Sequence, residues 1–150
     1  MLYWDESLAT GIAVVDEDHR GLFGLIKVID DAKNSDVFGD KVCAAIEALN
    51  DYAHDHFRRE EALMLLSGYI ARTRHEDEHK SFSITMKRLL QLYQVSPNLV
   101  SISGVVVYLT DWLRGHIAYS DQAYVNSMRE CGQLIDIASQ NLLNNIDLNF

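Results

Sequence analysis

Proline and glycine are scarce in this chain, with one and eight residues among 150. Turns between short strands depend on these two residue types, so their scarcity argues against a fold of many strands. Long helices are what such a composition favours. Apolar residues make up 48% of the chain, enough to build one sizeable core. We therefore expect an all-α protein of one domain.

Basic residues are also in deficit, with 13 Lys and Arg against 22 Asp and Glu and a formal net charge of −9. Nucleic-acid phosphates are bound by basic surfaces, so this balance argues against a nucleic-acid partner. No apolar run is long enough to cross a bilayer, and the first residues lack the basic segment and apolar stretch of a signal peptide. These absences predict a cytoplasmic protein without membrane insertion.

Cysteine occurs only twice, as Cys43 and Cys131. In a chain without an export signal, two cysteines are more often free thiols than a disulfide. The bundle expected below also places them at opposite ends, beyond the roughly 7 Å that a disulfide spans between Cα atoms. We therefore predict two free thiols.

Apolar residues recur at alternating spacings of three and four along four stretches, which is typical of helices in a bundle. Asp16 is the expected N-cap of the first helix, and Asp40 that of the second. Short connections make neighbouring helices antiparallel, so we expect an up-down-up-down four-helix bundle. The expected helices span about 17–33, 40–67, 70–93 and 102–130, with breaks at Asn34-Ser35-Asp36, Gly39 and Ser96-Pro97-Asn98.

The two ends of the chain fall outside these four helices. Residues 1–15 are expected to form an arm without regular structure that packs aromatic side chains on the bundle, which itself spans about 16–131. Residues 132–150 form an amphipathic helical tail, which either docks on the bundle or mediates self-association. The oligomeric state stays open.

Strong metal ligands occur in pairs near the middle of the chain. His56 and Glu60 stand four residues apart, and so do His75 and His79, so each pair shares one helix face. Both pairs lie on the apolar seams of their helices. An antiparallel bundle brings them to the same end as three further candidates, which are His19, His116 and Asp121.

Two positions test this geometry. Asp121 follows His116 by five residues, which places it ~140° around an ideal helix, so either a sideways reach or a local widening of the helix is needed. His54 precedes His56 by two residues and is rotated by ~200° from it. We expect His54 on the surface.

Five imidazoles and two carboxylates exceed the ligand number of one zinc ion and are too rich in nitrogen for calcium or magnesium. We interpret them as ligands of two transition-metal ions. If both carboxylates and a solvent-derived oxide or hydroxide bridge the ions, all but one place of two octahedra are filled. One open place beside a second redox-active iron suits dioxygen, and a nearly saturated site favours reversible binding over oxygen insertion.

The chain resembles the bacterial hemerythrins over about residues 3 to 125. The matching pieces are Trp4, Gly11-Ile12, Asp16 to His19, His56-Phe57-Arg58-Arg59-Glu60-Glu61, Leu63-Met64, Gly68-Tyr69, His75, His79, Trp112-Leu113, His116-Ile117, Asp121 and Tyr124. The resemblance implies two iron ions and reversible dioxygen binding for transport, storage, delivery or sensing, without enzymatic activity. It also implies the assignment of ligands: three histidines on one iron (His75, His79, His116), two on the iron with the open place (His19, His56), and bridging carboxylates (Glu60, Asp121).

The sequence departs from the family pattern at two places. Members often have glutamine before the first histidine, where this chain has Asp18, and proline after the Gly-Tyr pair, where it has Ile70. Neither change removes a ligand. Asp18 would place a negative charge near the site, so we hypothesise an effect on oxygen affinity or autoxidation.

Several alternatives stay open from the sequence. The same centre could serve an enzyme that reduces peroxide or nitric oxide or oxidises ferrous iron, or the bundle could be structural, holding zinc or no metal. Glu61 and residues 76–78 either form a solvated face or include a residue that orients a histidine. Delivery or signalling would need a protein partner. Five apolar residues near the ligands either line a dry oxygen pocket or are ordinary core: Phe23, Phe82, Leu109, Trp112 and Leu113.

Overall fold

The structure is a computed structural model, and it describes residues 3–33 and 40–145. Within these residues all regular structure is helical. In chain order the elements are η1 (Glu6–Leu8), α1 (Ala13–Ala32), α2 (Asp40–Leu66), α3 (Arg72–Val95), η2 (Pro97–Leu99), α4 (Ile102–Gly115), η3 (His116–Asp121), α5 (Gln122–Glu130) and α6 (Gln133–Leu143).

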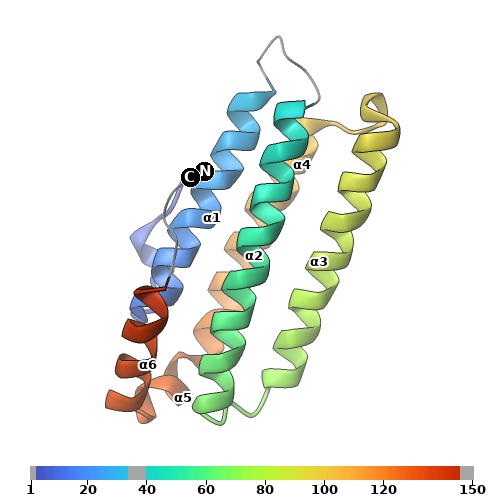
Figure 1. The fold of residues 1–150 in the computed structure, drawn as a ribbon. Helices are drawn as coiled ribbons and strands as arrows, with labels where there is room; N and C mark the ends of the chain where they lie inside the picture. Colours follow the sequence, from blue (N-terminus) through green and yellow to red (C-terminus); the bar gives the residue numbers. More distant parts are fainter. Residues whose placement is uncertain (1–2, 34–39, 146–150) are drawn as a thin grey trace.

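Four long rods form an antiparallel bundle, as the sequence predicted (Figure 1). The first three are α1, α2 and α3, and the fourth is the uninterrupted run of α4, η3 and α5. α2 packs against both α1 and α3, and α1 also packs against α4. The predicted seams are buried, with Ile29, Ile46 and Met86 among the core residues. The predicted break at Asn34-Ser35-Asp36 and Gly39 lies outside the described residues.

The start of α1 differs from the prediction. The helix begins at Ala13, and Asp16 lies inside its first turn instead of capping it. The carboxylate of Asp16 accepts hydrogen bonds from the backbone N–H and hydroxyl of Thr10, at 2.7 and 2.9 Å, and from the N–H of Gly11 at 3.0 Å. The N-cap prediction and that of an irregular arm up to residue 15 were therefore wrong. The helix extends upstream because Val14 and Val15 are buried in a core at this end.

The other boundaries lie closer to the predictions. α3 begins at Arg72, two residues after the predicted start, and the preceding turn contains Gly68 with φ of +65°. Cys43 and Cys131 are free, as predicted. None of the helices in the described ranges is both long and apolar enough to cross a membrane.

The predicted tail forms α6, which lies beside the first turns of α1 (Figure 1). It packs against both α1 and α2. The chain reverses at Gly132, whose φ of +44° is in the region where a side chain is strained. The tail therefore docks on the bundle within its described part, which ends before Ile146.

Candidate metal centre

Seven buried side chains from all four rods meet at one end of the bundle. α1 contributes His19, α2 contributes His56 and Glu60, α3 contributes His75 and His79, and η3 contributes the remaining two, His116 and Asp121. On α2 and α3 the four-residue spacing places each pair on one face. The structure therefore brings together every candidate ligand that the sequence singled out. His54 is exposed, as predicted.

One group of ligand atoms is built around Glu60. Its Oε2 lies 3.2 Å from Nε2 of His79 and 3.6 Å from Nε2 of His75. Nε2 of His79 in turn lies 3.1 Å from Nε2 of His116. One donor atom from each of these four residues falls within 4.8 Å of all the others, which is close enough to surround one ion.

A second group contains His19 and His56 and shares Glu60 with the first. Nε2 of His56 lies 3.7 Å from Oε2 of Glu60. Asp121 links the groups from the other side, because its Oδ2 lies 3.2 Å from Nε2 of His19 and its Oδ1 lies 3.1 Å from Nε2 of His116. Both carboxylates therefore lie between the two sets of histidines.

Asp121 reaches this position through a local widening of the helix. Residues His116–Asp121 form a π-helical turn, and the N–H of Gln122 donates to the carbonyl of Ile117, five residues earlier. In such a turn a residue five positions on lies nearly above the first. The sequence left open whether Asp121 reaches sideways or the helix widens, and the structure shows that the helix widens.

Many of the converging atoms lack a hydrogen-bond partner among the described residues. They are Nε2 of His19, His56 and His75, Oε2 of Glu60 and both carboxylate oxygens of Asp121. They approach one another to between 3.2 and 3.7 Å. Buried polar atoms without partners are costly, and a cation between them would satisfy imidazole and carboxylate atoms together. The donor set therefore fits metal ions.

The negative charges of the two buried carboxylates at this centre are offset by the histidines around them. Burial lowers the pKa of His75, but the carboxylates of Asp121 and Glu60 outweigh it and raise that pKa to about 10. Burial and Asp121 raise the pKa of Glu60, but His56, His75 and His79 outweigh them and hold it below its usual value. Without a metal, protons on imidazoles offset the carboxylates, and a metal ion would displace them.

Three of the five imidazoles have a carboxylate at Nδ1, the nitrogen that points away from the centre. Glu61 lies 2.9 Å from Nδ1 of His79, and Glu78 lies 3.2 Å from Nδ1 of His116. A proton on Nδ1 would be shared with the carboxylate, which leaves the lone pair of Nε2 directed into the centre. Of the acidic residues that the sequence left unassigned, Glu61 and Glu78 thus contact histidines, whereas Glu76 and Asp77 pair with Arg72 and Lys80.

The third carboxylate is Asp18, the residue that departs from the family pattern. Its Oδ2 lies 3.3 Å from Nδ1 of His56, and both its oxygens accept from the guanidinium of Arg59, at 2.8 and 2.7 Å. Burial raises the pKa of Asp18, but the hydrogen bonds from His56 and Arg59 outweigh it, so that pKa lies below its usual value. A buried ion pair therefore holds His56.

Tyr124 is a contact to the centre that the sequence did not assign. Its side chain is buried, and its hydroxyl donates a hydrogen bond to Oε1 of Glu60. The signals in the sequence are its place among the residues that match the family and its position three residues after Asp121, about one helical turn away.

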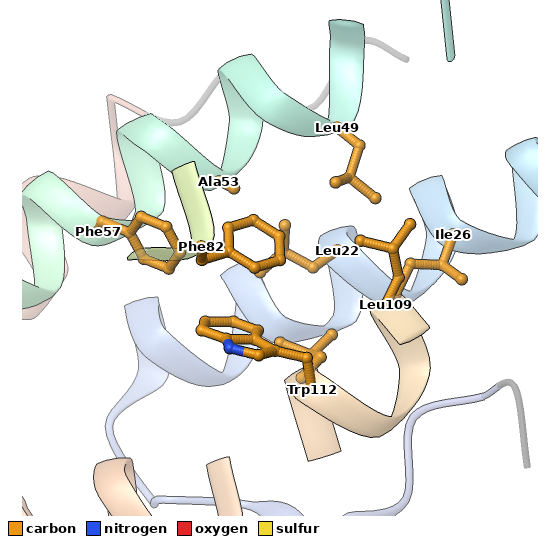
Figure 2. A pocket seen from close by; sticks show the side chains of 9 residues that line it. Leu22, Ile26, Leu49, Ala53, Phe57, Phe82, Leu109 and Trp112 are labelled. Carbon is orange, nitrogen blue, oxygen red and sulfur yellow. The ribbon is translucent and has the colours of Figure 1, made fainter. Parts of the chain in front are cut away.

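An apolar cavity lies inside the bundle (Figure 2), and two of the residues that line it stack on imidazoles of the centre. The volume that the centre of a water-sized molecule can occupy inside it is about 10 Å³. The cavity therefore has space for about one such molecule. Phe57 stacks on His79 and Trp112 stacks on His116, with ring centroids 3.9 and 4.6 Å apart. The lining residues are Leu22, Ile26, Leu49, Ala53, Phe57, Phe82, Leu109, Trp112 and Leu113.

Four of the five apolar residues expected near the ligands line this cavity, and Phe23 does not. Phe23 is buried and packs its ring edge-on against Trp4. The sequence missed Phe57, because a residue directly after a ligand is expected on another face of the helix.

The sequence agrees with known proteins over most of its length. The family described as Hemerythrin HHE cation binding domain matches residues 10–126. The chain belongs to the hemerythrin family. A bacteriohemerythrin of Pseudomonas paraeruginosa is 30% identical over 129 residues, covering 85% of this chain and 82% of the relative.

More distant hemerythrins match the same region. A hemerythrin-like protein of Naegleria gruberi is 28% identical, covering 81% of this chain and 88% of its own. A bacteriohemerythrin of Clostridium acetobutylicum is 25% identical over 84% of this chain and all of its own. A crystal structure of a leucine-to-phenylalanine mutant superimposes with a TM-score of 0.75 at 23% identity, over 83% of this chain and 95% of the other, which supports the fold.

Proposed function

We propose that this hemerythrin domain holds two iron ions and binds dioxygen reversibly, as a carrier, store or sensor of oxygen and not as an enzyme. The observation that carries the proposal is the convergence of five buried imidazoles on two shared carboxylates near an apolar cavity. The family description names a cation-binding domain, and the nitrogen-rich donor set favours a transition metal. We also propose that the chain forms one domain.

The proposed ligands divide into two sets. Three histidines would hold one ion (His75, His79, His116), two would hold the other (His19, His56), and two carboxylates would be shared between the ions (Glu60, Asp121). The two oxygens of Asp121 support this division, because one faces His19 and the other faces His116 and His75. Glu60 supports it too, because it belongs to both groups of converging donors.

When bound, two ferrous ions would supply the electrons and the open coordination place that dioxygen needs. The protein supplies the surroundings. Phe57 and Trp112 hold two imidazole rings by stacking and give the nearby cavity an apolar lining. Outer carboxylates hold protons at the Nδ1 atoms of three imidazoles, which keeps each Nε2 free for a metal.

Metal analysis combined with optical spectra tests the proposal. We expect about two irons per chain, and we expect the anaerobic reduced protein to gain visible absorption on exposure to air and to lose it under vacuum. Steady consumption of oxygen with turnover would instead indicate a redox enzyme. Zinc, or no metal and no colour, would indicate a structural bundle.

Replacing Ala53 with leucine should slow dioxygen binding. Ala53 is buried and lines the cavity, so a larger side chain there would fill space for about one small molecule. Overpacking of this kind also costs about 1–3 kcal/mol of stability. Stopped-flow mixing with oxygen measures the rate, and Ala62→Leu on the exposed face of the same helix is the control. Equal rates in the two variants would show that the cavity does not admit oxygen.

Replacing Asp18 with glutamine should slow autoxidation of the reduced protein. The carboxylate of Asp18 makes His56 a more basic ligand, which favours ferric iron. Replacing a residue that hydrogen-bonds to a metal ligand changes metal affinity or activity by about 10- to 100-fold. The decay of the oxygen-bound spectrum in air measures the rate, and Asp55→Asn, at an exposed acid on α2, is the control. Unchanged oxygen affinity and autoxidation in Asp18→Gln would refute a role for this residue.

A further inference from the structure

His19 differs from three other histidines of the centre in how it is held. His56, His79 and His116 each have a carboxylate at Nδ1, whereas Nδ1 of His19 has no hydrogen-bond partner among the described residues. Nε2 of His19 faces Oδ2 of Asp121 at 3.2 Å, and the ring stacks on Trp4, at 6.0 Å between centroids, and meets the edge of His56. Because no acceptor holds the Nδ1 side, the direction of this imidazole depends on the position of α1.

The first turn of α1 lacks a cap of its own. Ile12 stands at the N-cap position and provides no side-chain acceptor for the free N–H groups of the first turn. The N–H of Val14 instead donates to the hydroxyl of Ser139, at 3.1 Å, and this bond is buried. Ser139 belongs to α6, so an element from the far end of the chain supplies the cap.

Apolar packing joins the same two elements. Ile135 of α6 is buried in one cluster with Ile12, Val14 and Val15. That cluster also contains Tyr124, whose hydroxyl donates to Glu60. α6 thus contacts the start of the helix that carries His19, beside which it lies in Figure 1, and it shares a cluster with the residue that holds Glu60.

We propose that α6 positions His19, with Ser139 and Ile135 as the positioning residues. His19 follows Val14 by five residues, or ~7.5 Å along the helix, so a shift of the first turn is transmitted to its ring. α6 lies beyond residues 10–126, the part that matches the family, so this chain adds a support that the matched domain does not include. The inference rests on the proposed function in taking His19 as a ligand.

Experiments on the metal-free protein test this support without relying on iron. In Ser139→Ala, amide hydrogen exchange at Val14 should rise about fivefold, the effect of losing a helix cap. The imidazole NMR signals of His19 should shift or broaden, while those of His56, His79 and His116 keep their positions because carboxylates hold them. Ile135→Ala should act in the same way, and Ile137→Ala, at a residue 53% exposed on the same helix, should change neither measurement.

Metal release separates positioning from general stability. With cobalt(II) as the probe, we expect a chelator to remove one of the two bound equivalents about tenfold faster from Ser139→Ala and Ile135→Ala than from the wild-type protein. Ile46→Ala, a buried residue of α2 near the other end, should lower stability but speed release of both equivalents alike. Unchanged His19 signals in Ser139→Ala, or equal release of both equivalents, would overturn the inference. Failure of the wild-type protein to bind two ions or oxygen would instead overturn the proposed function.

Discussion

Replacing Glu60 with glutamine is expected to weaken the binding of both metal ions and not of one alone. Glu60 is the only residue that belongs to both groups of converging donors within the described chain. Glutamine keeps the volume and an oxygen for Tyr124 but removes the negative charge that faces the imidazoles. Replacing a residue that only hydrogen-bonds to a metal ligand lowers metal affinity by about 10- to 100-fold. The loss of a ligand shared by two ions should therefore lower the affinity for each ion by at least ~100-fold.

Iron content after dialysis against a weak chelator, with the visible spectrum in air, measures this loss. His54→Gln is the matched control, because His54 lies on the same helix but is exposed. Circular dichroism should show a folded Glu60→Gln protein, since the substitution removes a buried charge and adds no volume. Retention of one full equivalent of iron would contradict the shared role of Glu60.

Replacing Arg59 with methionine is expected to destabilise the protein strongly. Arg59 donates two hydrogen bonds to the buried carboxylate of Asp18, and methionine would remove both of them together with the positive charge that faces it. Removing one partner of a buried ion pair costs about 3–5 kcal/mol, and the partial exposure of Arg59 places the expected cost at about 3 kcal/mol. For a chain of this size the melting temperature should fall by about 6–12 °C.

Arg58→Met is the control for this effect, because Arg58 precedes Arg59 and is exposed. Thermal unfolding of the metal-free protein at neutral pH measures both variants. The pKa of Asp18 is lower in the folded state than in the unfolded state. The ion pair therefore adds to the free energy of unfolding at pH values above the usual carboxyl pKa, and this stabilisation is lost as the pH falls through the lowered pKa of the folded protein. Similar melting temperatures for the two variants would mean that the pair adds little.

The sequence was sufficient where the information is local to one helix. Spacings of three and four identified the buried seams, and a spacing of four placed His56 with Glu60 and His75 with His79. It fails at the start of α1, where the strong N-cap residue Asp16 predicts a boundary after the observed start at Ala13. Asp16 uses its carboxylate on the preceding loop, because burial of Val14 and Val15 extends the helix beyond it.

Other features depend on contacts between helices, which periodicity does not specify. Glu61 and Glu78 reach histidines while Glu76 and Asp77 do not, and that choice depends on how the neighbouring rods are rotated. The docking of α6 likewise depends on the turn at Gly132 and on an unfilled cap far away in the chain.

The helices, the faces they bury and the set of residues that can hold metal are predictable from residue order, because each follows from the regular rotation of residues along a helix. Three features came from the folded protein alone: which carboxylate holds which imidazole, the π-helical turn that brings in Asp121, and the capping of α1 by α6. Those choices depend on the packing of side chains between rods. Packing fixes the distance and rotation between helices that are far apart in the chain, and no local pattern contains that information.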